Sequence, residues 1–120
     1  PVSGTHIFEE SGKTVFGNWV YVSPKETVTV KYTYRLPFTV RVASGSNLDG
    51  KAQSFSVLYQ KQAGSFNVKL NSRLVYPSSW KAAWSRGFDG GASDSGKLSM
   101  HGDFDGDRFA ATVFDARQNL

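Results

Sequence analysis

The 120-residue sequence contains no cysteine and only one methionine. The absence of cysteine excludes a disulfide-stabilised scaffold and a thiolate metal site. It is compatible with an extracellular bacterial protein and with a cytosolic one. No apolar run approaches the roughly 20 residues that a membrane-spanning helix needs, and no signal peptide is recognisable. We expect any membrane attachment to depend on an anchor segment that this sequence lacks.

Clustered positive charge is also missing. The 14 Lys and Arg residues and 10 Asp and Glu residues give a formal net charge of +4. The basic residues are scattered along the chain and never form a run, so they offer no obvious track for a phosphate backbone. We therefore expect no nucleic-acid partner.

Catalytic motifs are absent as well. His6 and His101 are the only side chains that normally titrate near neutral pH, and neither lies in a nucleophile motif. The sequence contains no Gly-x-Ser-x-Gly, no His-Glu-x-x-His and no phosphate-binding glycine loop. The sequence predicts a protein that is not an enzyme and has no required cofactor.

What the sequence does contain is alternation, most clearly in Thr27–Phe38, TVTVKYTYRLPF. A period of two with β-branched and aromatic residues predicts a strand with one buried face and one wet face. Pro37 has no N–H for a ladder and should end the pairing. We expect the fold to be organised around this strand, with four residues facing the core: Val28, Val30, Tyr32 and Tyr34.

Similar patterns predict several other strands. Gln53–Gln62 and Phe66–Leu74 should form a hairpin through Ala63-Gly64-Ser65, where glycine allows positive φ. Pro77–Ser85 has its tryptophans at a spacing that suits a helix or a strand. We interpret it as a strand because the rest of the chain has period two. The remaining predicted strands are Thr5–Glu9, Lys13–Ser23, Phe38–Ala43, Lys97–His101 and Arg108–Asp115.

Seven to nine short strands, glycine-rich turns and no convincing helix predict an all-β fold. The spacing is typical of an antiparallel two-layer β-sandwich with an immunoglobulin-like outline. The length suits a single domain over residues 1–120. We interpret it as part of a longer surface protein.

Three segments carry a resemblance to a known family: Gly12–Gly17, Tyr32–Phe38 and Gln60–Gly64. Together they span roughly residues 12–70. Here the chain resembles the C-terminal extracellular part of a bacterial surface-protein family, domain of unknown function 4012. The resemblance implies a cell-surface location and anchoring by an N-terminal helix that this sequence lacks. It implies no catalytic residue.

Four aromatic residues form the first candidate site: Tyr76, Trp80, Trp84 and Phe88. Exposed rings could stack on sugar faces or contact a partner protein. The alternative is that these rings close the sandwich core, because large apolar rings are usually buried. Whether the tryptophan rings are exposed distinguishes the two interpretations.

The second candidate site is the acidic turn Asp103-Phe104-Asp105-Gly106-Asp107. Alternate aspartates around a glycine resemble part of a calcium loop, with Asp103, Asp105 and Asp107 as oxygen ligands. No later glutamate completes that pattern. The simpler interpretation is a polar turn between two strands.

These observations lead to two hypotheses of function. The first is a non-catalytic extracellular module of a bacterial cell-surface protein, with a structural, adhesive or partner-recognition role. Its partner would be a protein or glycan at the cell surface, bound by the polar loops Ser44–Lys51 or Arg86–Gly96. The alternative is a carbohydrate-binding module that uses exposed aromatic residues.

Overall fold

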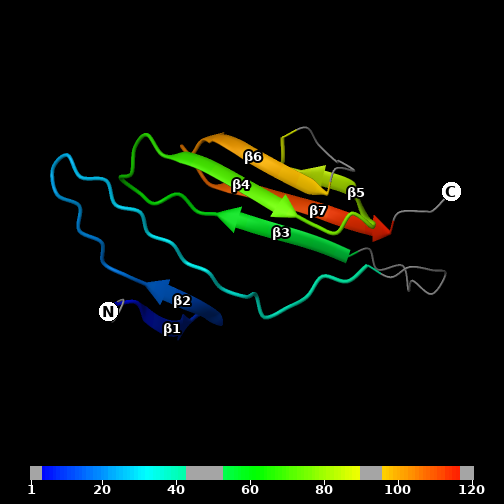
Figure 1. Cartoon of the computed structure of the whole chain (residues 1–120), viewed down its shortest axis with the longest axis horizontal. Coiled ribbons are helices and arrows are strands. Elements are labelled where there is room, and N and C mark those ends of the chain that lie inside the picture. Colours follow the sequence, from blue (N-terminus) through cyan, green and yellow to red (C-terminus); the bar gives the residue numbers. More distant parts are fainter. Residues whose placement is uncertain (1–3, 43–52, 90–95, 117–120) are drawn as a thin grey trace. The chain divides into compact units, whose positions relative to one another are not determined.

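The computed structural model describes residues 4–42, 53–89 and 96–116. Within these ranges all regular structure is β, so the predicted all-β class is confirmed, and no helix that could cross a membrane occurs there. Backbone contacts divide the chain into two compact units, one up to Arg35 and one from Leu36 onwards. The described strands, drawn in Figure 1, are β1 (His6–Glu10), β2 (Lys13–Gly17), β3 (Gln53–Tyr59), β4 (Lys69–Val75), β5 (Trp80–Arg86), β6 (Lys97–Asp103) and β7 (Arg108–Ala116).

The first unit contains one hairpin. β1 and β2 pair antiparallel, with Glu10 opposite Lys13 at the closed end. The two connecting residues, Ser11 and Gly12, both have positive φ, at 53° and 71°. A two-residue connection of this kind matches the right-handed twist of the strands that it joins. The ladder ends at Gly17, although the sequence predicted a strand as far as Ser23.

The predicted strand Thr27–Phe38 is wrong, because no residue of this stretch belongs to a β-ladder. The residues expected to face a core are exposed by 40–63%: Val28, Val30, Tyr32 and Tyr34. Their contacts are local, since the Phe16 ring lies 6.2 Å from that of Tyr32 and 5.7 Å from that of Tyr34. Alternation states which side chains a strand would bury, but burial also needs a paired strand and a covering layer.

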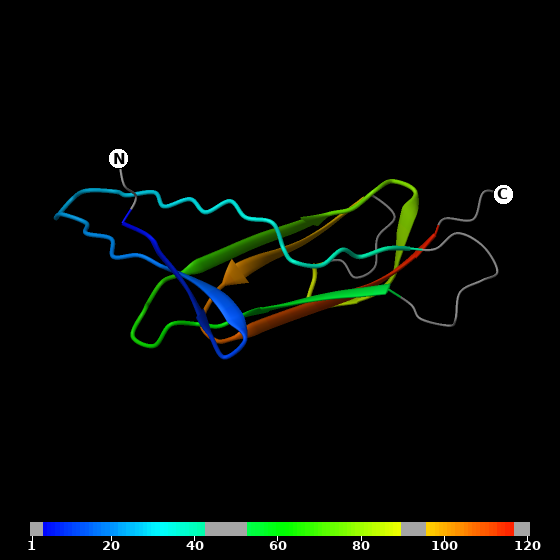
Figure 2. The same ribbon diagram turned by 90° about the horizontal axis from the view of Figure 1, so that it is seen from below.

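The second unit contains two antiparallel sheets. One has the order β3-β7-β5 and the other pairs β4 with β6. Figure 2 shows the two sheets as separate layers, with β4 and β6 on one side and β3 and β7 on the other. This arrangement agrees with the predicted two-layer sandwich. The buried side chains between the layers are Tyr76, Ala82, Phe88, Leu98, Met100, Ala110 and Phe114.

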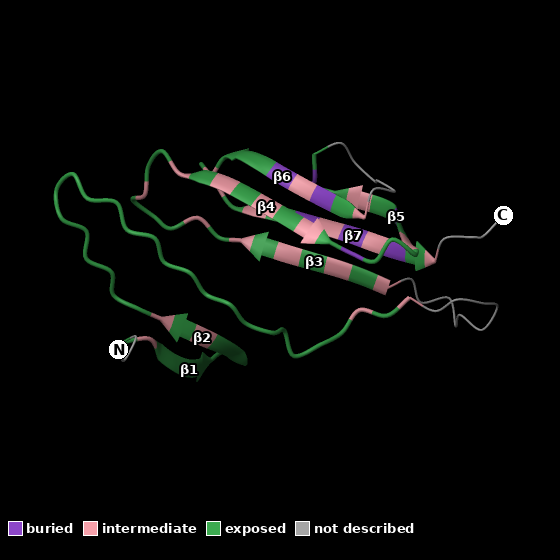
Figure 3. Cartoon of the chain, in the orientation of Figure 1, coloured by how far each residue is buried: buried purple, intermediate pink, exposed green. Residues whose placement is uncertain are grey.

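The core is concentrated on β6 and β7, where Figure 3 shows alternating buried positions. Met100 of β6 and Ala110 and Thr112 of β7 are fully buried. The predicted strand Phe38–Ala43 is not a strand within its described part, residues 38–42. Val40 and Val42 nevertheless pack against this core. The predicted loop Ser44–Lys51, and residues 90–95 of the loop Arg86–Gly96, lie outside the described residues.

The predicted hairpin of β3 and β4 is also wrong. β3 pairs with β7 and β4 pairs with β6, so the connection between them crosses from one layer to the other. The Tyr59 hydroxyl of β3 hydrogen-bonds the Ser72 hydroxyl of β4 at 2.6 Å. The inward faces of the two strands therefore meet across the core. Period-two sequences predict that such faces are buried, but not which strand lies beside which.

β5 confirms the predicted strand in the Pro77–Ser85 region but adds a bulge. The register with β7 shifts between Ala82 and Trp84. An extra residue turns the following side chains to the other face. Trp80 and Ala82 pack into the core, whereas Trp84 is 50% exposed. The bulge thus separates two tryptophans that an unbroken strand would place on the same face.

Gly87 lets the chain leave β5 and reach the other sheet. Its φ is +84°, and a Cβ at this position would collide with the carbonyl oxygen of Phe109. Only glycine meets both conditions without strain. Phe88 then enters the core, and the Asp89 amide donates a 2.7 Å hydrogen bond to the Ser99 carbonyl of β6. The segment after β5 therefore links the two layers.

Candidate functional site

The outer face of the three-stranded sheet carries the most prominent group of exposed apolar side chains in the second unit. Leu58 of β3 is directly opposite Phe109 of β7, and the two are 55% and 54% exposed. Trp84 of β5 is opposite Val113, two pleats further along β7. Because paired residues in antiparallel strands share a face, Leu58, Trp84, Phe109 and Val113 lie on one surface. We call these four residues the aromatic face.

Charged residues border the aromatic face. Lys81 is opposite Asp115 and Arg86 is opposite Ala111, on the same side of the sheet as Trp84. These three charged side chains contrast with the apolar centre. Phe109 and Val113 are four residues apart, which separates the two ends of the face by about 13 Å along the strand. The face could therefore contact an extended ligand at two places, with polar groups at its border.

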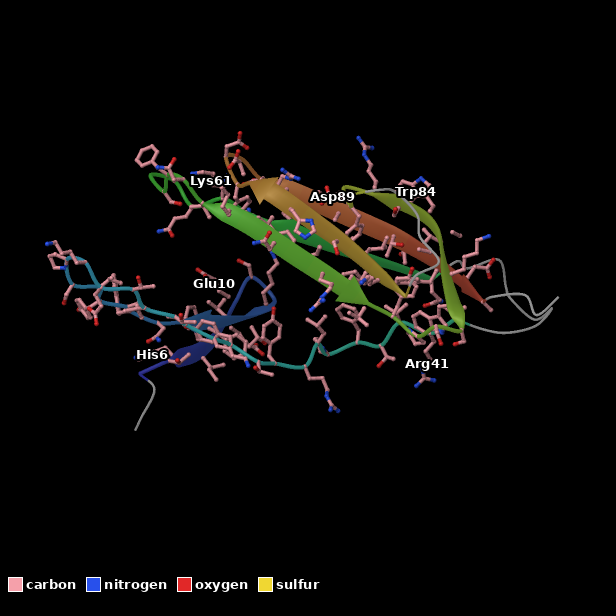
Figure 4. All side chains as sticks on the ribbon, turned by 45° about the horizontal axis from the view of Figure 1, so that its top comes forward. His6, Glu10, Arg41, Lys61, Trp84 and Asp89 are labelled. Carbon is pink, nitrogen blue, oxygen red and sulfur yellow. The ribbon has the colours of Figure 1, made fainter. Side chains whose placement is uncertain are left out.

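The bulge in β5 positions Trp84 on this face. The Thr112 hydroxyl donates a 3.0 Å hydrogen bond to the Trp84 carbonyl. Thr112 is completely buried. A bulge disrupts the ladder locally, and this part-buried hydrogen bond gives the Trp84 carbonyl a donor from a core side chain. Figure 4 labels Trp84 on β5.

Among the four aromatic residues predicted as a binding site, only Trp84 is exposed. Tyr76 and Phe88 are buried, at 6% and 8% exposure. Trp80 is half-buried, with its ring centre 5.3 Å from that of Phe114. The Tyr76 ring also packs on Phe114, with the ring centres 4.9 Å apart. Three of the four residues therefore fill the core, and Trp84 acts with neighbours that the sequence did not single out.

Three members of the aromatic face were missed by sequence reasoning: Leu58, Phe109 and Val113. The alternation of β7 shows that Phe109, Ala111 and Val113 share one face. It does not show which face is buried, because the core side carries two small residues, Ala110 and Thr112. A preference for large residues in the core would place Phe109 inside. Phe109 lies outside instead, because Ala110, Thr112 and the ring of Phe114 occupy the buried side of β7.

The acidic turn joins β6 to β7 and is held by neighbouring chain segments. The Lys69 ammonium forms an ion pair with Asp103. This hydrogen bond and the charge of Lys69 lower the pKa of the Asp103 carboxyl. The backbone amide of Lys61 donates to Asp107 Oδ1 at 2.7 Å. These bonds are typical of a polar turn that neighbouring segments of the chain hold in place.

A metal centre does not appear in the described part of the chain. No three side chains of His, Cys, Asp or Glu there lie close enough together to hold an ion. All three aspartates are exposed, and Asp103 and Asp107 already have protein partners. The structure does not bring the three aspartates of the predicted calcium loop together as a ligand set.

A second polar arrangement lies on β6. Asp89 Oδ2 accepts hydrogen bonds from the His101 amide at 2.8 Å and from His101 Nδ1 at 2.9 Å. The hydrogen bond from the His101 ring has the largest effect on the Asp89 carboxyl, and together with the bond from the His101 amide it lowers the pKa of that carboxyl. Figure 4 labels Asp89 beside β6. The pair fixes the imidazole ring against the outer side of the two-stranded sheet.

No family model, no curated protein and no solved structure matches this chain.

Proposed function

We propose that this chain is a non-catalytic recognition module of a bacterial cell-surface protein, and that it binds a surface partner through the aromatic face. The observation that carries the proposal is the exposure of Trp84, Phe109 and Leu58 on one side of the three-stranded sheet, at 50–55% each. Side chains this large are usually buried, and adjacent exposed ones mark contact surfaces. The immunoglobulin-like outline and the resemblance to the surface-protein family belong to the same proposal.

A rigid sheet suits a recognition role. The three strands are paired along their length, and the core beneath them is fully buried at Ala110 and Thr112. Side chains on such a surface lose little conformational freedom when a partner binds, which favours affinity. Aromatic residues are also the commonest anchors in the centres of protein interfaces.

Carbohydrate binding is the second candidate function, because two exposed aromatic rings lie on one sheet face. Trp84 and Phe109 come from neighbouring strands, β5 and β7. Ring faces at two places along a flat surface could contact two sugars of one chain. If the chain binds glycans, adding a soluble glycan oligomer should change the intrinsic fluorescence of Trp84. If the chain binds only a protein partner, adding the same oligomer should leave this fluorescence unchanged.

The test uses the purified chain and two double variants. In Trp84→Ala with Phe109→Ala, both rings of the aromatic face are lost. The matched control is Trp19→Ala with Phe66→Ala. It removes the same residue types outside the aromatic face, at positions that are 88% and 85% exposed. We measure sedimentation with intact bacterial cells and with purified cell-wall polysaccharide, and check the fold of each variant by circular dichroism.

We expect the first variant to lose at least roughly thirtyfold in affinity, because the loss of even one anchor ring costs about 2 kcal/mol or more in a typical interface. The control should bind as the unchanged chain does. Equal losses in the two variants would contradict a role for the aromatic face, and unchanged binding in both would place recognition elsewhere.

A further inference from the structure

The acidic turn between β6 and β7 contains an Asp-Gly pair, Asp105-Gly106. In such a pair the glycine nitrogen can attack the preceding side-chain carboxyl, because glycine has no Cβ to hinder the approach. The chain contains two further pairs, Asp89-Gly90 and Asp49-Gly50, of which the second lies outside the described residues. The structure distinguishes Asp105 from Asp89 by the bonds that each carboxylate makes.

His101 holds the Asp89 carboxylate in place. Asp89 Oδ2 accepts hydrogen bonds from the His101 amide at 2.8 Å and from His101 Nδ1 at 2.9 Å. The Asp89 amide is also fixed, because it donates to the Ser99 carbonyl. The Asp89 carboxyl must therefore give up both bonds to His101 before its Cγ turns towards the next backbone nitrogen.

The Asp105 carboxylate is exposed and has no hydrogen-bond or ion-pair partner among the described residues. The Gly106 amide likewise makes no hydrogen bond with a described residue. A Cβ on Gly106 would meet no described atom within 4 Å, so nothing crowds the nitrogen. Asp105 lines a groove of about 500 Å³ at this end of the second unit, which gives water access to its side chain.

The other aspartates of the acidic turn are restrained by their own contacts. Asp103 is paired with Lys69, and the Phe104 amide that follows it donates a 2.8 Å hydrogen bond to a backbone carbonyl. Asp107 accepts a hydrogen bond from the Lys61 amide. These contacts hold the two ends of the turn and leave its middle unrestrained.

We propose that Asp105 is a site of spontaneous backbone isomerisation. The Gly106 nitrogen bonds to Asp105 Cγ, the carboxyl hydroxyl and the amide hydrogen leave together as water, and a cyclic succinimide forms. Water then adds to one of the two ring carbonyls and breaks its bond to nitrogen. Opening at Cγ restores aspartate. Opening at the former main-chain carbonyl leaves isoaspartate, in which the peptide bond runs through Cγ and the mass is unchanged.

Isoaspartate adds one carbon to the backbone in the middle of the turn. The longer turn should weaken the hydrogen bond between the Lys61 amide and Asp107. The flanking strands are held by other pairings, β6 by β4 and β7 by β3 and β5, so the fold should remain. Hydrogen exchange at the Lys61 amide should therefore be faster in the isomerised chain. Unchanged exchange there would contradict this consequence.

The experiment incubates the purified whole chain in neutral buffer, below its unfolding temperature, and samples it over weeks. Peptide mapping with electron-transfer fragmentation distinguishes isoaspartate from aspartate and gives the rate at each Asp-Gly pair. We expect isoaspartate to form roughly fivefold or more faster at Asp105 than at Asp89, because one retained hydrogen bond lowers the reactive population by about that factor. An equal or slower rate at Asp105 would overturn the proposal.

The same measurement in guanidinium chloride shows whether the structure causes the difference. In the unfolded chain Asp89 loses its bonds to His101, so the two rates should become similar. A preference for Asp105 that persists unchanged would assign the effect to local sequence and overturn the structural argument.

Gly106→Ala tests the attacking nitrogen. It keeps the Asp105 carboxylate, and its added methyl group should slow the reaction several-fold. The rate at Asp89 in the same variant is the internal control and should not change. A rate at Asp105 that Gly106→Ala leaves unaltered would contradict attack by the Gly106 nitrogen.

Discussion

The two units of the chain use similar sequence patterns and reach different outcomes. Thr27–Phe38, mostly in the first unit, has the most regular alternation in the chain, yet it forms no ladder there and its apolar side chains are 40–63% exposed. β7, in the second, alternates less distinctly and contains the small residues Ala110 and Thr112, which are completely buried. Regular alternation is therefore a weaker guide to burial than the number of strands and layers around a segment.

The difference follows from pairing. β7 lies between β3 and β5, and β6 packs over its inner face through Leu98 and Met100. Each inward side chain of β7 is therefore surrounded by other elements. The first unit has a single two-stranded ladder, β1 with β2. An isolated hairpin is marginally stable in water because too little apolar surface is buried.

Amide hydrogen exchange gives the strongest test of this difference between the two units. The amides of residues 27–35 form no backbone hydrogen bond with another described residue, whereas those of β7 lie in two ladders. Exchange in 27–35 should therefore be at least about a thousandfold faster than at the centre of β7. We would measure it by mass spectrometry on peptic fragments. Protection of 27–35 comparable to that of β7 would show that this segment forms a paired strand in solution.

Several parts of the fold could be predicted from the sequence because they depend on local chemistry. The turn at Ser11-Gly12, the strand character of Trp80–Ser85 and the last two strands all follow from turn residues and alternation. The pairing of β3 with β7 could not be predicted, since any two alternating strands satisfy the same pattern. The hairpin expected between β3 and β4 was wrong for this reason.

The candidate site was predictable only in part, because a bulge in β5 determines which tryptophan lies on the aromatic face. The sequence identified Trp84 as an aromatic residue that could bind a ligand. The bulge between Ala82 and Trp84, which moves this ring away from Trp80, has no clear sequence signal. Its stabilising hydrogen bond comes from Thr112, 28 residues away.

Two substitutions, one in each unit, compare how much a single apolar side chain contributes to the free energy of unfolding. Met100→Ala should lower the free energy of unfolding by about 2–5 kcal/mol, because Met100 is fully buried and truncation leaves a cavity. Val30→Ala should cost less than about 1 kcal/mol, since Val30 is 46% exposed. Urea denaturation followed by circular dichroism measures both. A cost at Val30 equal to that at Met100 would mean that the alternating stretch is buried in solution.

The smallest effect concerns two hydroxyls that face each other across β5 and β7. The register pairs Ser85 with Thr112. The Thr112 hydroxyl bonds to the Trp84 carbonyl, while the buried Ser85 hydroxyl has no hydrogen-bond partner among the described residues. Thr112→Val should cost about 1–3 kcal/mol, because a part-buried carbonyl loses its donor. Ser85→Ala should be nearly neutral or slightly stabilising, because it removes a buried polar atom that gains nothing from folding.

The same urea titrations separate these outcomes. If the bulge depends on the Thr112 hydrogen bond, Thr112→Val should also change the fluorescence of Trp84, measured in a chain where Trp19 and Trp80 are replaced by phenylalanine. Ser85→Ala should leave that fluorescence unchanged. Equal costs for the two substitutions, with no change in fluorescence, would show that packing alone holds Trp84 on the outer face. In that case the order of the second unit would come from its buried apolar layer, without a contribution from the polar bond inside it.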